Sequence, residues 1–289
     1  MKFELIIAIM SGIGSLIGWG LVDFFSANAL KKNKMSEAQA TFVLYLITST
    51  ILWTIVALTM KNLPHISPIS IIQVSIFAFL NVAAYLLFFS ALKIGTLGTI
   101  STIFATYSVG ASFISILFFN EQTTPLRLLS LLIVFVGIAA VCIQDYKSFK
   151  LIKGFRLAII AAILLSIFFP FLDSFLSNNS GGIFWAALIN SIMTIFFLIY
   201  LLSKKEKMTN ITKKARVMIF AGIANAVGVI SLNWGFESTS LTSVIVVVSS
   251  AVPLVSATLG YYFFKERLHI IQYIGIIIIV SGMALLFSS

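Results

Sequence analysis

Two aspartates lie within long apolar stretches of this 289-residue sequence. Asp23 comes three residues after Gly20, and Asp173 comes three residues after Pro170. If these stretches cross a membrane, a charged side chain at the centre costs about 2.5–3.5 kcal/mol on insertion scales and needs a reason to be there. Glycine and proline weaken helices. The pattern indicates either acids that gate a cavity or accept protons beside a helix bend, or acids that reach the headgroups near helix ends.

Amide and polar aromatic side chains are the best candidates for binding a small molecule in such surroundings. Asn81 and Asn225 occupy matching positions 144 residues apart. A buried Asn needs hydrogen-bond partners, and an equivalent pair is expected to face a shared cavity. The candidate binding residues are Asn81, Asn225, Tyr85, Tyr107, Trp19, Trp185, Asn190, Asn233 and Trp234. The alternative is that Asn holds helices together while Trp lies in the interfacial belt.

The sequence gives little support for enzymatic catalysis, a metal site or ATP-driven transport. The single cysteine, Cys142, and the two histidines, His65 and His269, give no metal-ligand spacing, so neither a metal site nor a cofactor is predicted. No Gly-rich phosphate loop is present to drive transport with ATP. An intramembrane lipid-modifying enzyme needs a nucleophile with a base, or a metal cluster, and a membrane scaffold needs an extramembrane region. Both stay open as alternatives.

The composition predicts the elements that position these residues. Of all residues, 60% are hydrophobic and 10% are charged, whereas soluble domains carry about 25% charged residues. The net charge of +10 comes from short basic clusters between apolar stretches, which face anionic lipid and give no nucleic-acid surface. We therefore predict an all-α, multi-pass protein of the cell membrane, whether inner or plasma. The expected helices are 4–26, 38–60, 69–92, 96–119, 126–144, 155–177, 183–203, 216–236, 240–264 and 269–287.

The loops that follow odd-numbered helices contain 16 of the 19 Lys and Arg residues. By the positive-inside rule this basic end faces the cytoplasm, and both termini lie outside. The first apolar stretch has no cleavage site followed by a polar mature region, so we interpret it as a membrane helix and not as a signal peptide.

Internal repetition is the strongest single signal. Phe118-Phe119-Asn120-Glu121 with Gly137 recurs as Phe263-Phe264-Lys265-Glu266 with Gly282, 145 residues later. The repeat predicts duplication of a five-helix unit, in residues 1–145 and 146–289. An odd number of helices inverts the second copy, an architecture typical of alternating-access carriers with a site between the halves. In each copy the Glu is expected to accept from N–H groups at the start of the following helix.

Small residues spaced four apart, Gly14 with Gly18 and Ser256 with Gly260, predict close helix packing or, less favoured, a homodimer.

These residues resemble the EamA-type members of the drug/metabolite transporter superfamily. The resemblance rests on Trp19-Gly20, Ala91-Leu92-Lys93, the Phe-Phe-x-Glu junctions, and Pro253 with Phe264 to Leu268, Gln272, Gly275 and Gly282. It implies a carrier of metabolites with ten helices in two domains, often an exporter of amino acids or related compounds. It also implies cytoplasmic termini, opposite to the charge count, and the first half lacks the proline of the motif.

We therefore expect a secondary transporter for a small neutral or zwitterionic metabolite, with that molecule and membrane lipid as its partners.

Overall fold

The computed structural model describes residues 2–118, 124–145, 150–205, 215–239, 245, 248–249 and 251–288. The helices of the first half are α1 (Lys2–Lys31), α2 (Glu37–Thr59), α3 (Pro68–Ile94), α4 (Leu97–Ala105), α5 (Tyr107–Phe118) and α6 (Pro125–Cys142). The short strands β1 (Ile143–Asp145) and β2 (Lys150–Leu151) follow. Those of the second half are α7 (Phe155–Ser177), α8 (Gly182–Ser203), α10 (Arg216–Ser238), α12 (Val252–Phe264) and α13 (Ile270–Ser288).

The helix boundaries have local causes in the sequence. Ser36 forms a capping box with Gln39 at the start of α2, and the Ser67 side chain caps α3. Each satisfies a backbone N–H that a helix start leaves without an intrahelical acceptor. In the second half, Gly154 and Gly181 precede α7 and α8 with a φ of 84°, a left-handed conformation that favours glycine.

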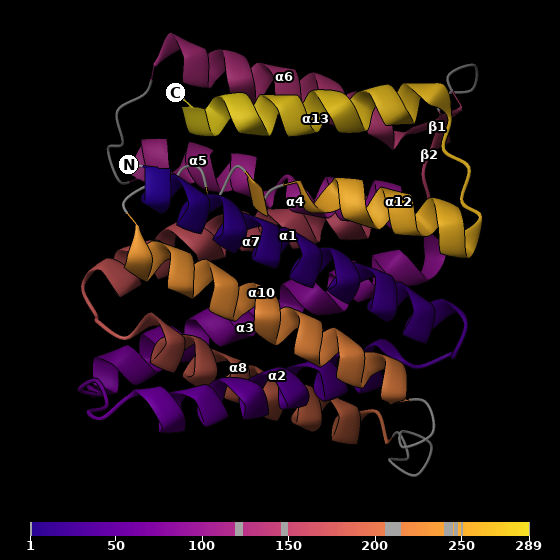
Figure 1. Ribbon diagram of the computed structural model, residues 1–289. Coiled ribbons are helices and arrows are strands. Elements are labelled where there is room, and N and C mark those ends of the chain that lie inside the picture. Colours follow the sequence, from indigo (N-terminus) through magenta and orange to yellow (C-terminus); the bar gives the residue numbers. More distant parts are fainter. Residues whose placement is uncertain are drawn as a thin grey trace.

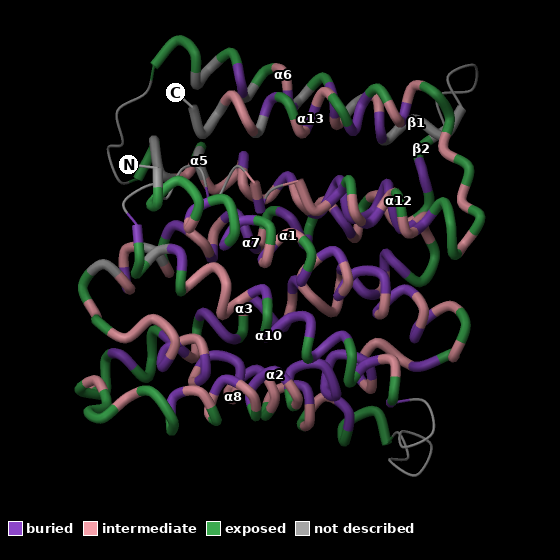
Figure 2. The backbone as a smooth tube through the Cα atoms, viewed as in Figure 1, coloured by how far each residue is buried: buried purple, intermediate pink, exposed green. Residues whose placement is uncertain are grey.

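The outer surface of the molecule is apolar, as a lipid-facing surface requires. Large hydrophobic side chains stand exposed on helices from both halves, including Ile17 (46%), Phe79 (59%), Leu132 (61%) and Ile277 (61%). By length and composition, six described helices can cross a membrane: α1, α2, α3, α7, α8 and α10. Figure 2 shows that buried segments concentrate in the middle layers, while α6 and α13 are largely intermediate or exposed.

The helices are arranged with an inverted pseudo-twofold symmetry. Figure 1 shows α6 paired with α13 along one edge and α2 beside α8 along the other, with α1, α3, α7 and α10 between them. The contacts follow the symmetry: α1 packs on α10 and its counterpart α7 packs on α3, while α5 packs on α7 and α12 packs on α1. Both termini lie at one end of the bundle (Figure 1). The ends of α1, α3 and α8 and the strands β1 and β2 lie at the other end, which we call the basic end (Figure 1).

Small residues allow the close helix contacts. A Cβ added to Gly18 on α1 would lie 2.7 Å from the Ala224 carbonyl oxygen of α10. Gly137 of α6 and Gly282 of α13, which the repeat singled out, face the partner helix in the same way; a Cβ on Gly137 would lie 2.9 Å from the Ile279 backbone nitrogen. Gly18 and its neighbours therefore serve packing within one chain, whereas the homodimer stays a prediction.

Two sequence predictions need correction. The expected helix 96–119 is two helices, α4 and α5, because Thr106 leaves the α-helical hydrogen-bond pattern. The expected helix 240–264 is likewise not continuous, because Ala251 lies in a turn and α12 begins at Val252. The fold is all-α as predicted, and β1 and β2 add only a short antiparallel pair at the basic end.

Candidate functional site

A cavity of about 250 Å³ lies between the two halves. Helices α1 to α5 line it from the first half, and α7, α8, α10 and α12 line it from the second. Most of its wall is apolar and aromatic, with polar groups contributed by one carboxylate, four amides, three tyrosines and three serines among the described residues.

Breaks in two membrane-spanning segments lie beside this cavity. Thr106, between α4 and α5, has φ −68° and ψ −5°. Ala251, which lies 145 residues later at the equivalent position of the repeat, has φ −76° and ψ 10° and precedes α12. Pro253 lies in the first turn of α12. A backbone N–H has no intrahelical acceptor there, so the N–H that proline lacks costs no hydrogen bond. Irregular backbone inside a membrane is tolerated where it lines a cavity, and residues next to both breaks line this one.

Asp23 is the carboxylate of the cavity wall. Its side chain is 7% exposed, and its Oδ2 accepts a hydrogen bond of 3.0 Å from the Ser256 hydroxyl of α12. The alternative position, at the headgroups beside Lys31 and Lys32, is therefore wrong for Asp23. Helix α1 runs unbroken through Gly20, so no bend at that glycine directs the acid. A Cβ on Gly20 would instead lie 2.5 Å from a Val255 methyl carbon, which shows that the glycine lets α12 approach.

The predicted counterpart of Asp23 in the second half is Asp173, three residues after Pro170. Pro170 is buried within α7, and the helix continues past it to Ser177. Asp173 follows on the same helix, but its side chain lies outside the described residues.

Aromatic rings in contact with one another form one wall of the cavity. Tyr45 meets Tyr85 edge to face with centroids 5.4 Å apart, and Tyr85 meets Phe104 at 5.7 Å. Tyr107 stacks on Phe169 at 4.7 Å. Tyr85 and Tyr107 line the same cavity as the Asp23 carboxyl group. The wall thus offers π faces in the same cavity as an acidic side chain.

The four amides of the wall come from three helices. Asn225 donates to the Thr48 hydroxyl (3.2 Å) and so links α10 to α2. Asn190 and Asn233 each donate to a carbonyl of their own helix, at 2.7 and 2.9 Å. Asn81 of α3 lines the cavity opposite α8 and is 7% exposed.

The structure places two predicted binding residues away from the cavity. Trp185 is fully buried between Phe175 and Phe184, and its indole N–H donates to the Ser180 carbonyl (3.0 Å). Trp234 is 47% exposed on the apolar outer surface. Trp19 does line the cavity.

Among the described residues, the lining of the cavity extends to one end of the bundle and stops short of the other. Its lining includes Leu176 near the end of α7 and Gly182 at the start of α8, both at the end of the bundle where the termini lie. Toward the basic end, the last lining residue on α1 is Asp23, eight residues before the helix ends at Lys31. At 1.5 Å per residue, roughly 12 Å of packed helix closes the basic end there.

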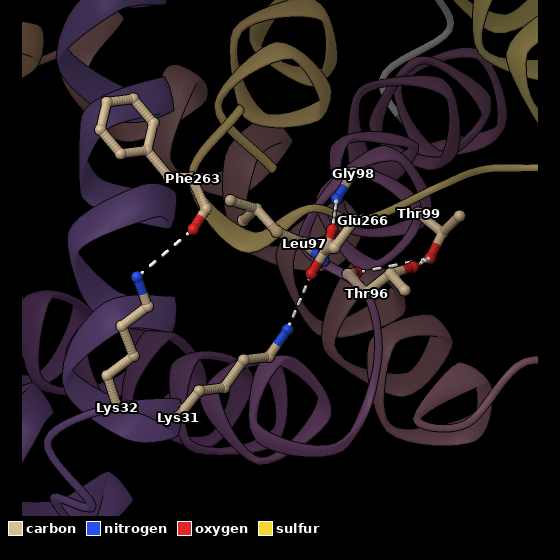
Figure 3. Close-up of polar contacts among 8 residues, drawn as sticks. All are labelled: Lys31, Lys32, Thr96, Leu97, Gly98, Thr99, Phe263 and Glu266. Carbon is tan, nitrogen blue, oxygen red and sulfur yellow. Dashed lines mark hydrogen bonds and ion pairs between the residues drawn. The ribbon is translucent and has the colours of Figure 1, made fainter. Parts of the chain in front are cut away.

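Glu266 connects the two halves at that closed end (Figure 3). Its carboxylate accepts from the backbone N–H of Leu97 at 2.7 and 2.9 Å and from that of Gly98 at 3.4 Å, at the start of α4. The Lys31 ammonium at the end of α1 donates to Oε1 at 3.0 Å. Thr96, the N-cap residue of α4, makes no side-chain cap, so Glu266 takes that role. We call this cluster of Lys31, Leu97, Gly98 and Glu266 the basic-end clamp.

The clamp corrects a prediction from sequence. Glu266 does bind a helix start, but the helix is α4 of the other half and not the α13 that follows it. At the start of α13, the Gln272 side chain accepts from the backbone N–H of His269 (3.1 Å) instead. Glu121, the counterpart in the first half, lies outside the described residues.

The comparisons with known proteins agree with this architecture. The model of the EamA-like transporter family matches residues 6–143 and again residues 152–288. The chain belongs to the EamA-like transporter family. It is a multi-pass membrane transporter of the drug/metabolite transporter superfamily, whose EamA-like members are transporters and not enzymes.

A solved structure described only as "Crystal structure of protein" resembles this EamA-like chain with a TM-score of 0.66. It is 14% identical, and the match covers 94% of this chain and 95% of that chain. At such low identity the likeness shows the fold alone. No curated protein matches the sequence.

Sequence reasoning did not single out several residues that line the cavity of this EamA-like transporter. Tyr45, Phe168 and Phe169 are among them. Tyr45 carried a usable signal, because a polar-tipped aromatic eight residues into an apolar helix needs a partner. Phe168 and Phe169 carried none, since the chain has 27 phenylalanines and most apolar positions look alike.

Proposed function

We propose that the protein is a secondary carrier that moves a small neutral or zwitterionic organic molecule across the membrane by alternating access, with export as its direction. The observation that carries this proposal is a cavity between two inverted halves, whose described lining extends to one end of the bundle and is separated from the other end by about 12 Å of α1. Among described residues, no Lys, Arg or His lines the cavity. A polyanion such as a sugar phosphate would lack a counter-charge there.

The inverted symmetry supports the alternating mechanism. Because the halves have equivalent elements in opposite orientation, an exchange of their conformations would close the open end and open the basic end at a similar free energy. The breaks at Thr106 and Ala251 supply equivalent bending points beside the site. The basic-end clamp holds the conformation described here, since it joins Glu266 of one half to α1 and α4 of the other.

A binding screen followed by transport tests the proposal. The purified protein is heated with amino acids, amines, nucleosides, sugars and organic acids, and a ligand at 100 times its Kd should stabilise it by about 2.7 kcal/mol. Ligands that stabilise it are then tested for counterflow in proteoliposomes. Asn81→Ala in the cavity should lower both signals, whereas Asn62→Ala in the exposed loop after α2 should change neither.

Counterflow of a sugar phosphate in preference to every neutral or zwitterionic compound would overturn the substrate class. Binding without counterflow of any ligand would overturn the carrier mechanism.

A further inference from the structure

Asp23 is a buried acid whose described surroundings do not neutralise it. Its hydrogen-bond donor is the Ser256 hydroxyl at 3.0 Å, a neutral group. An ionised carboxylate has acceptor sites for about four hydrogen bonds. Ser101, which is 1% exposed, provides a second neutral hydroxyl beside the same carboxylate. Removing a charge from water without pairing it is costly.

A second acceptor in the same cavity is also unused. Asn190 donates its Nδ2 to the Ala186 carbonyl, but its buried Oδ1 has no hydrogen-bond partner within the described chain. Its side chain lines the cavity from α8, whereas Asp23 lines it from α1. The cavity therefore presents two acceptors, one of them a carboxyl group, that a molecule rich in N–H donors would satisfy.

The aromatic wall favours the same kind of ligand. Trp19, Tyr85 and Tyr107 line the cavity together with Asp23. A cation over such a ring gains about 0.5–2 kcal/mol, most when it is shielded from water. No cationic side chain occupies this position among the described lining residues, and the Lys31 ammonium is engaged with Glu266 in the basic-end clamp.

We propose that the transported molecule carries a protonated amine, which Asp23 binds as its counter-ion while the aromatic wall holds an apolar body. This inference rests on the proposed carrier function. It restricts the substrate to molecules with an ammonium group, and it adds singly charged small amines to the zwitterions of that proposal. Asp23 is then a specificity-determining residue for the ammonium group. A cavity of about 250 Å³ suits a compound with one ring and a short aminoalkyl chain.

The experiment uses three probes of nearly equal shape: phenethylamine, 2-phenylethanol and 3-phenylpropionate. Their binding to the purified full-length protein is measured by calorimetry at pH 7, where the amine is protonated. Hydrogen bonds to charged groups contribute about 1.5–3 kcal/mol. The wild type should therefore bind the amine at least about tenfold more tightly than the alcohol, and it should bind the propionate weakest of the three.

Substitutions test whether Asp23 causes the preference for the amine over the alcohol. Asp23→Asn should reduce the preference for amine over alcohol to less than about threefold, and Asp23→Glu should restore most of it. Glu37→Gln removes a carboxylate that pairs with Lys93 at the basic end, outside the cavity, and should leave the preference unchanged. If Asp23→Asn does not fold, Asn190→Leu should still lower amine affinity more than alcohol affinity, because it removes the second acceptor.

The outcomes separate the two proposals. Equal binding of amine and alcohol by the wild type overturns the amine inference, yet it leaves a small-molecule site between the halves. An amine preference that persists in Asp23→Asn overturns the assignment to Asp23. Absence of binding by all three probes overturns the inference and also counts against the proposed function.

Discussion

Replacing Glu266 with Ala should open the basic end of the protein. The change removes the carboxylate cap on the N–H groups of Leu97 and Gly98, and loss of an N-cap costs about 0.5–2 kcal/mol. It also removes the ion pair with Lys31, whose partners are 21% and 10% exposed, and such a pair adds up to about 1 kcal/mol. These contacts join the two halves in the conformation described here, and we expect them to break when the basic end opens. A loss of about 2 kcal/mol therefore corresponds to an approximately thirtyfold shift toward the open one.

Ser26 provides the reporter for this shift. It lies on α1 one turn beyond Val22, toward the basic end. It is fully buried, and its hydroxyl has no hydrogen-bond partner among the described residues. In a Cys142→Ala background, Ser26→Cys is labelled with a membrane-impermeant maleimide added at either face. Labelling from the basic face should accelerate about thirtyfold when Glu266→Ala is added, since the rate follows the open population.

The matched control is the Lys93–Glu37 pair at the same end. Its N–O distance is also 3.0 Å, but it joins α3 to α2 within the first half, and its side chains are 45% and 24% exposed. Lys93→Ala should change labelling by less than about threefold, because breaking this pair does not separate the halves. If Glu266→Ala folds but leaves the labelling rate at the wild-type value, the clamp does not hold the closed state and the argument fails.

Further substitutions test the site and the packing. Trp19→Leu should weaken binding of any transported ligand at least about fivefold, whereas Trp234→Leu, on the lipid-facing surface, should leave calorimetric affinity unchanged. Gly18→Val should lower the melting temperature markedly, because the added Cβ meets α10 backbone within 3 Å and forces a shift that costs about 1–3 kcal/mol; an unchanged melting temperature would contradict the packing. Thr48→Val should destabilise the protein by about 1–2 kcal/mol in a urea or thermal titration, since it leaves the Asn225 amide without its acceptor.

Apolar periodicity and charge placement were enough to predict most of the fold, because lipid requires every spanning segment to satisfy its own backbone. The break at Thr106 was not predictable in this way, since it lies in an apolar stretch where no proline marks a bend. The roles of Trp19 and Trp234 also could not be separated, because both tryptophans have apolar neighbours and only packing decides which side each faces. The repeated Phe-Phe-x-Glu pattern singled out Glu266 as a helix-capping residue. It did not predict the donor, because the Leu97 N–H lies 169 residues away in sequence and meets Glu266 only through the inverted arrangement of the halves.

The link between Glu266 and Leu97 has a consequence for how the protein is made. The start of α4 enters the membrane long before the ribosome reaches residue 266, so the Leu97 N–H waits for its acceptor while much of the chain is still being inserted. A fragment that ends after the first half would leave that helix start without its carboxylate cap and Lys31 without its ion pair. The two halves thus share one helix cap, because the second half supplies the acceptor for the first turn of α4. Their assembly is expected to mature only once the last pair of helices is in place.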